Sequence, residues 1–128
     1  MSDVEVVIRR LGWCFFAVSL VVVVVLSLEP QVPFVSAMNV SDKSLHLLAY
    51  LVLCFFSCFS FYESRLSLKS VLLPLAVCLS IGLAVEVIQP FFSRSMEWMD
   101  FISEIVGCLL GLAMARLLLA IVVPKSGR

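Results

Sequence analysis

The sequence predicts an all-α integral membrane protein that folds as a single bundle of four transmembrane helices. Hydrophobic residues make up 62% of the 128-residue chain and charged residues 14%, against about 45–50% and about 25% in soluble domains. A soluble domain of this size cannot bury so much apolar surface. We therefore expect lipid to surround most of it. The apolar residues gather in four runs, each long enough for the roughly 17–25 helical residues that cross a bilayer core.

The first run covers residues 11–28 and follows a polar start that ends in Arg9-Arg10. This basic pair, the apolar stretch and the triplet Val35-Ser36-Ala37 also resemble a signal peptide with its cleavage site. The run is longer than the usual signal-peptide core, and acidic residues precede it. We therefore favour a retained first span over a cleaved one.

The second run covers residues 45–62 and is rich in aromatic side chains. The stretch before it, residues 29–44, has two prolines and no clear periodicity, which predicts a loop. Either Ser41 or Asp42 can accept a hydrogen bond from a free N–H of the next turn, which favours a helix start at this point.

The third run covers residues 71–89, and the fourth covers residues 101–123. Pro74 is tolerable in the first turn of the third run, and Pro90 ends it. Residues 91–99 then form a short polar hairpin. The fourth run ends before a proline and a basic tail.

Lys and Arg mark the cytoplasmic side of membrane proteins, and their placement here is uneven. If the four spans alternate in direction, the side of the termini carries six of them and the other side two: Arg9, Arg10, Arg65, Lys69, Lys125 and Arg128 against Lys43 and Arg94. We therefore expect an up-down bundle with both termini in the cytoplasm.

This topology places polar residues from three spans at the same depth, near the non-cytoplasmic surface. An ionisable group inside a span costs on the order of 2.5–3.5 kcal/mol on insertion scales and is a functional-site candidate by default. Helical spacing also puts these residues on shared faces. The candidate ligand-binding residues are Asp42, Lys43, His46, Tyr50, Glu86, Gln89, Arg94, Asp100 and Glu104.

Each of these residues also has a purely structural interpretation. Asp42 and Asp100 can cap helices, Lys43 and Arg94 can be solvated loop charges, and Tyr50 can be an ordinary core aromatic. Glu86 and His46 can form an ion pair between two helices that only holds the helices in place. For the cluster as a whole, we favour a ligand-binding or active site over a structural role.

Composition and motifs exclude several function classes. The net charge is zero, so no basic field indicates nucleic acid. All five cysteines lie in apolar runs, where Cys behaves as a small hydrophobe; packing is favoured even for the i,i+4 pair Cys54 and Cys58. The sequence predicts no cofactor and no metal, because it lacks close-spaced ligands such as H-E-x-x-H.

The polar residues also resemble a known family. The order Asp42-Lys43-x2-His46-x3-Tyr50, Glu86-x2-Gln89, Arg94-x5-Asp100 and Gly107-x3-Gly111 is similar to that of the VanZ-like family of small bacterial membrane proteins. The match covers residues 42–111. It departs from the family at Glu104, where the family commonly has Asn; the acid adds negative charge beside two other carboxyl groups.

The resemblance implies one VanZ-like membrane domain over residues 1–128 and a place in the bacterial inner membrane, at the cell envelope. The family is named for a protein associated with teicoplanin resistance. Most members lie outside resistance gene clusters, so the resemblance supports the membrane class and the site more than a resistance phenotype.

Two main functions remain open. In the first, the protein binds a lipid or a lipid-linked, anionic cell-envelope component, held by Lys43 and Arg94. In the second, it is an intramembrane enzyme on a lipid-linked substrate, with His46, Glu86 and Asp100 as catalytic candidates. A variant of the enzyme places a divalent metal between His46, Glu86 and either Glu104 or Asp100.

A structural subunit or a small transporter ranks last, because a chain this short lacks inverted repeats and would need to oligomerise. The small-residue stripe at Gly107 and Gly111 would permit such self-association.

Overall fold

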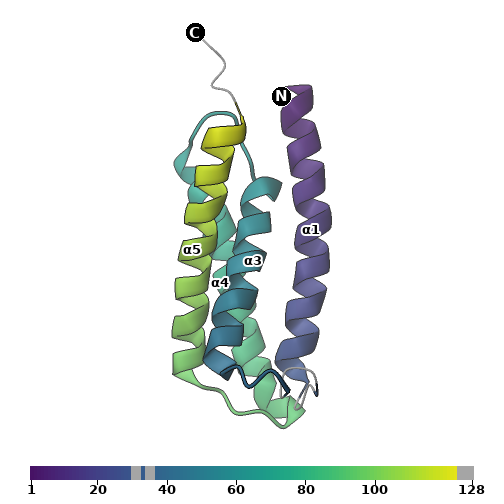
Figure 1. The fold of residues 1–128 in the computed structure, drawn as a ribbon, viewed down its shortest axis with the longest axis vertical. Coiled ribbons are helices and arrows are strands. Elements are labelled where there is room, and N and C mark those ends of the chain that lie inside the picture. Colours follow the sequence, from purple (N-terminus) through teal and green to yellow (C-terminus); the bar gives the residue numbers. More distant parts are fainter. Residues whose placement is uncertain (30–32, 34–36, 124–128) are drawn as a thin grey trace.

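The structure, a computed structural model, describes the chain except for residues 30–32, 34–36 and 124–128, and the described residues are helical with no strand (Figure 1). They form α1 (Asp3–Leu28), α3 (Asp42–Ser60), α4 (Leu68–Ile88), the short 3-10 helix η1 (Gln89–Phe92) and α5 (Trp98–Val122). Four helices in this part of the chain are long and apolar enough to cross a membrane. The all-α class and the presence of four candidate membrane-spanning helices are thus confirmed.

Two sequence predictions lie outside the described residues in whole or in part. The basic tail after Val123 lies wholly outside them, and the cleavage-like triplet at 35–37 lies partly outside them.

Helix α1 begins earlier than the sequence suggested. The polar start was expected to precede the first helix, yet α1 already begins at Asp3. Ser2 and Glu5 form a capping box, in which the Glu5 N–H donates to Ser2 Oγ at 3.3 Å and the Ser2 N–H donates to Glu5 Oε2 at 3.0 Å. These two bonds satisfy N–H groups that a helix start leaves free, so the helix extends beyond its apolar run.

Helix α3 lies between α1 and α5, and α4 completes the bundle behind it (Figure 1). Glycines set the closest approaches. A Cβ atom at Gly107 would overlap the Leu47 carbonyl, and one at Gly111 would overlap the Leu51 carbonyl. Because these contacts are with backbone atoms, the two helices would have to move apart to admit any side chain. Within one chain this glycine pair therefore packs against α3; self-association through it stays a prediction.

The distribution of polar and apolar side chains is the reverse of that in a soluble protein. Large apolar side chains are exposed along all four helices, whereas His46, Glu86, Gln89 and Glu104 are buried. This arrangement is stable when hydrocarbon surrounds the bundle, because apolar side chains then meet lipid and polar ones meet each other.

Pro74 lies in the second turn of α4, not in the first as the sequence suggested, because a capping box at Ser67 starts the helix at Leu68. A proline there leaves the carbonyl four residues earlier, that of Ser70, without its helical donor. Arg116 of α5 donates to that carbonyl, and its Nη2 also lies 3.0 Å from the Ser70 hydroxyl. The arginine thus replaces the hydrogen bond that the proline removes.

We expect Arg116→Leu to lower the free energy of unfolding by about 1–3 kcal/mol, because it leaves the buried Ser70 carbonyl without a donor. Pro74→Ala restores an N–H at position 74, so the same arginine substitution should cost less in that background. Thermal unfolding of the four variants in mild detergent measures this coupling. Arg65→Leu, on an exposed loop, is the control and should change little; equal costs in the two backgrounds would contradict the explanation.

Candidate functional site

Four buried ionisable side chains meet at one end of the bundle. His46 comes from the start of α3, Glu86 from the end of α4, and Asp100 and Glu104 from the start of α5. His46 Nδ1 lies 2.9 Å from Glu104 Oε1 and 3.9 Å from Glu86 Oε1, while its Nε2 lies 3.7 Å from Asp100 Oδ2. We call these four residues the acid–imidazole cluster.

Neighbouring groups hold the carboxylates in place. Gly82 leaves room for Glu104, since a Cβ atom at Gly82 would overlap the Glu104 Oε2 atom. The backbone N–H of Glu97, in the hairpin before α5, donates to Glu86 Oε2 at 3.3 Å. The cluster is therefore shaped by a glycine on one helix and closed by backbone from the hairpin.

The cluster is incompletely paired. Among the described residues, Glu86 Oε1, Glu104 Oε2 and Asp100 Oδ1 are buried without a hydrogen-bond partner. Buried polar atoms usually have a partner, and a buried charge needs a counter-charge or a metal. Three carboxyl groups share one imidazole here, so the cluster needs further positive charge or protons.

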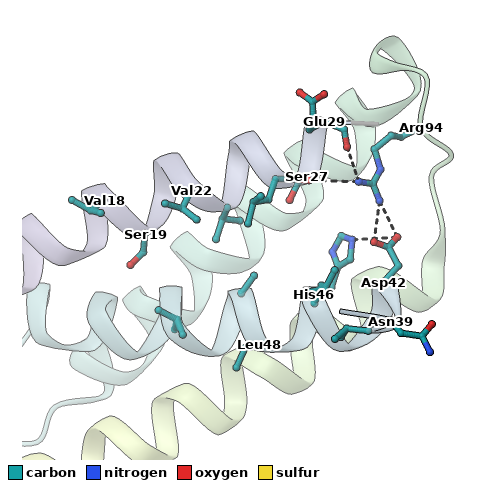
Figure 2. A pocket seen from close by; sticks show the side chains of 16 residues that line it. Val18, Ser19, Val22, Ser27, Glu29, Asn39, Asp42, His46, Leu48 and Arg94 are labelled. Atoms are coloured by element: carbon teal, nitrogen blue, oxygen red, sulfur yellow. Dashed lines mark hydrogen bonds and ion pairs between the residues drawn. The ribbon is translucent and has the colours of Figure 1, made fainter. Parts of the chain in front are cut away.

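Arg94 lies at the edge of this cluster and joins three segments (Figure 2). Its Nη2 donates to both carboxylate oxygens of Asp42 at 2.9 and 3.1 Å, and its Nη1 donates to the Glu29 carbonyl at 3.2 Å and the Leu26 carbonyl at 3.5 Å. Asp42 therefore binds this arginine, while the helix cap is Ser41, whose hydroxyl accepts from the Ser44 N–H.

The other predicted residues have different surroundings. Lys43 pairs with Glu97 at 3.4 Å, with both side chains about half exposed, so it stays at the surface. Gln89 is buried, and its Nε2 donates to the Ser27 carbonyl of α1 at 3.2 Å. Tyr50 is buried in the core.

A cavity of about 790 Å³ opens between α1 and α3. Figure 2 shows Val18, Val22 and Leu48 along its length, with Arg94 and Asp42 at one end. His46 lines the same end. The cavity thus has apolar walls and one polar, charged end.

Three buried thiols form a second cluster. Cys54, Cys78 and Cys108 come from α3, α4 and α5, and their sulfur atoms lie within 4.8 Å of one another. The sequence suggested a pair of Cys54 with Cys58, but only the fold could show this three-helix convergence.

The structure brings His46, Glu86, Asp100 and Glu104 together, as the helix faces predicted, with Arg94 and Asp42 at their edge. Sequence reasoning missed two contributors. It assigned the first span no polar role, yet backbone carbonyls of α1 accept from Arg94 and Gln89; carbonyls leave no signal in a sequence. It also overlooked Glu97, which was visible only as one more charge in the hairpin.

Fold and site together define a multi-pass helical membrane protein with a buried acid–imidazole cluster beside an apolar cavity. Comparison with protein-family models, with curated proteins and with solved structures finds no match for the chain.

Two charge pairs near the site should differ in strength. We expect a double-mutant cycle of Arg94→Ala with Asp42→Ala to give a coupling energy of about 1 kcal/mol, because one partner is largely buried and several charge-assisted bonds are made. The matched cycle of Lys43→Ala with Glu97→Ala should give about 0–0.5 kcal/mol, as for an exposed pair. Thermal unfolding in mild detergent measures both; equal couplings would contradict this ranking.

Proposed function

We propose that this protein binds a membrane amphiphile with an anionic headgroup, either a lipid or a lipid-linked cell-envelope component, in the cavity between α1 and α3. The cavity itself supports this proposal, because its apolar walls end at Arg94. Acyl chains would lie along Val18, Val22 and Leu48, at a depth where water is scarce.

Arg94 would bind the anionic group, at a polar end of the cavity that the carboxylates of Asp42 and Glu29 also line. The terminal N–H groups of Arg94 already donate to Asp42 and to backbone carbonyls, so a phosphate would take the place of Asp42 on this planar guanidinium, whose geometry suits phosphate oxygens. Its present carboxylate partner, Asp42, has a side chain that is 50% exposed, so it can turn toward solvent as a headgroup enters. Lys43 does not line the cavity, so Arg94 is the principal cation of this proposal.

We also propose an orientation for the chain. An up-down bundle with both termini in the cytoplasm follows from the excess of Lys and Arg on that side. The contacts fit this topology: the Ser64 N–H donates to Glu5 at one end, and Arg94 reaches the carbonyl of Glu29 at the other. The order of polar motifs supports membership of the VanZ-like family and a place in the bacterial inner membrane.

Filling the cavity should abolish lipid retention. We expect Val22→Trp to reduce the lipid that stays bound to the purified protein in mild detergent, as counted by native mass spectrometry. The matched control is Val21→Trp on the same helix, because Val21 is exposed and does not line the cavity. Equal retention by the two variants would contradict binding at this site.

The same assay tests the headgroup. The protein is mixed with vesicles of phosphatidylglycerol or phosphatidylcholine that have the same acyl chains. We expect Arg94→Ala to lose a preference of about tenfold for the anionic lipid, the equivalent of one charge-assisted contact, and high salt should reduce the preference of the unsubstituted protein. A preference that survives the substitution at every ionic strength would exclude the arginine as the anion site.

A second candidate is an intramembrane enzyme, which one observation favours. His46 lines the cavity and also contacts Glu104, so an imidazole–carboxylate pair faces a bound amphiphile. The pair has the geometry of a general base with an orienting carboxylate. The nearest such carboxylate is Glu104, and Glu86, a catalytic candidate from the sequence, lies farther away.

Catalysis predicts that His46→Gln and Glu104→Gln abolish turnover while the protein still accumulates in the membrane. The protein is reconstituted in proteoliposomes that contain a lipid-linked phosphate ester. Mass spectrometry of the lipid then measures how much of the ester has been converted. A structural role instead predicts that lost function accompanies lost protein. An unaltered ester with the unsubstituted protein would argue against the enzyme.

A further inference from the structure

We propose that His46 Nδ1, Glu86 and Glu104 bind one divalent first-row transition metal ion, of the zinc or manganese class. The inference goes beyond amphiphile binding and does not depend on it. It rests on three buried side chains from three different helices, whose ligand atoms lie within 4.8 Å of one another.

The spacing of the donor atoms suits a metal. Metal–ligand bonds of about 2.0–2.2 Å place neighbouring ligand atoms about 3.0 Å apart in an octahedron and about 3.4 Å apart in a tetrahedron. The distances from His46 Nδ1 to the carboxylate oxygens of Glu104 and Glu86, 2.9 and 3.9 Å, bracket these values. Small side-chain rotations would therefore complete the coordination.

Burial and charge point in the same direction. Both glutamates have no exposed surface, and each has one oxygen without a partner among the described residues. Their two negative charges equal the charge of a divalent ion, so the ion would balance them while the imidazole stays neutral. An imidazole ligand favours zinc over magnesium or calcium, which prefer oxygen donors alone, and the two carboxylates also suit manganese.

The other face of His46 supplies the support that metal-bound imidazoles usually have. Its Nε2 faces Asp100 Oδ2 at 3.7 Å, and if the two close to hydrogen-bond length, this carboxylate would orient the ring and hold the proton on the far nitrogen. Asp100 is thus a positioning residue. A metal on this second face is disfavoured, because it would need Asp42, which is half exposed and already bound to Arg94.

The site would change the role of His46. With a metal on Nδ1, the direct contact of 2.9 Å between this nitrogen and Glu104 Oε1 would be replaced by two bonds to the ion. Because the ring also lines the cavity, the ion would lie just behind the wall that the headgroup of a bound amphiphile meets.

Metal content of the full chain tests the proposal. The protein in mild detergent is stripped with a chelator, loaded with Zn²⁺ or Mn²⁺ alone, freed of excess ion, and analysed by inductively coupled plasma mass spectrometry and by thermal unfolding. We expect about one ion per chain and a higher melting temperature with metal. Glu86→Gln and Glu104→Gln should each weaken binding at least about tenfold.

Two variants keep the test valid if those proteins fail to fold. Asp100→Asn removes no ligand and should weaken binding about 10–100-fold, and Gly82→Ala should do so by displacing the Glu104 carboxylate. Glu63→Gln, at the opposite end of the bundle, is the matched control. Cys54→Ala tests the thiol cluster as the rival site. Both Glu63→Gln and Cys54→Ala should bind the metal ion as the unsubstituted chain does.

Several outcomes would overturn the proposal. The unsubstituted protein could hold neither ion and gain no stability from either, which would leave protons or water to satisfy the cluster. The ion could persist in the glutamate variants, or disappear in Cys54→Ala, which would place it among the thiols. In a parallel loading with Ca²⁺ alone, retention of Ca²⁺ by a protein that holds neither Zn²⁺ nor Mn²⁺ would exclude the imidazole as a ligand. None of these measurements uses lipid, so they stand apart from the test of amphiphile binding.

Discussion

Charge balance at the only imidazole of the chain is the constraint on which this end of the bundle depends. Three carboxyl groups from two helices converge on His46, in an interior surrounded by apolar side chains. These side chains are almost fully buried, so each charge must be matched by a proton, a cation or a donor within the bundle. The helices α3, α4 and α5 are therefore held together at the depth where their polar groups lie.

Room for these groups comes from residues without side chains. Gly82 gives space to Glu104, and Gly107 brings α5 so close to α3 that the carboxylate of one helix reaches the imidazole of the other. Close approach has a second effect, because it removes the gap that lipid or water would otherwise enter. Small residues thus determine the electrostatics indirectly, through the distance between helix axes.

Two arginine side chains donate hydrogen bonds to backbone carbonyls at points where the helical hydrogen-bond pattern is interrupted or ends. Arg116 supplies the donor that Pro74 removes from α4, and Arg94 donates to carbonyls at the end of α1. A guanidinium has several donors in a fixed plane, so one side chain can join segments that are distant in sequence. His46, in turn, belongs both to the buried cluster and to the cavity wall, which links any ligand in the cavity to the state of the cluster.

The sequence by itself determined the all-α class and the four candidate spans, and it predicted that the polar groups gather at one end, because run length and helical spacing are local properties of the chain. The partners were decided only by the tertiary structure. Glu104 rather than Glu86 lies nearest to His46, Lys43 lies at the surface, and the thiols of three helices converge. Partner choice depends on how far each helix is rotated and shifted along its axis, and contacts between residues far apart in sequence set those two quantities.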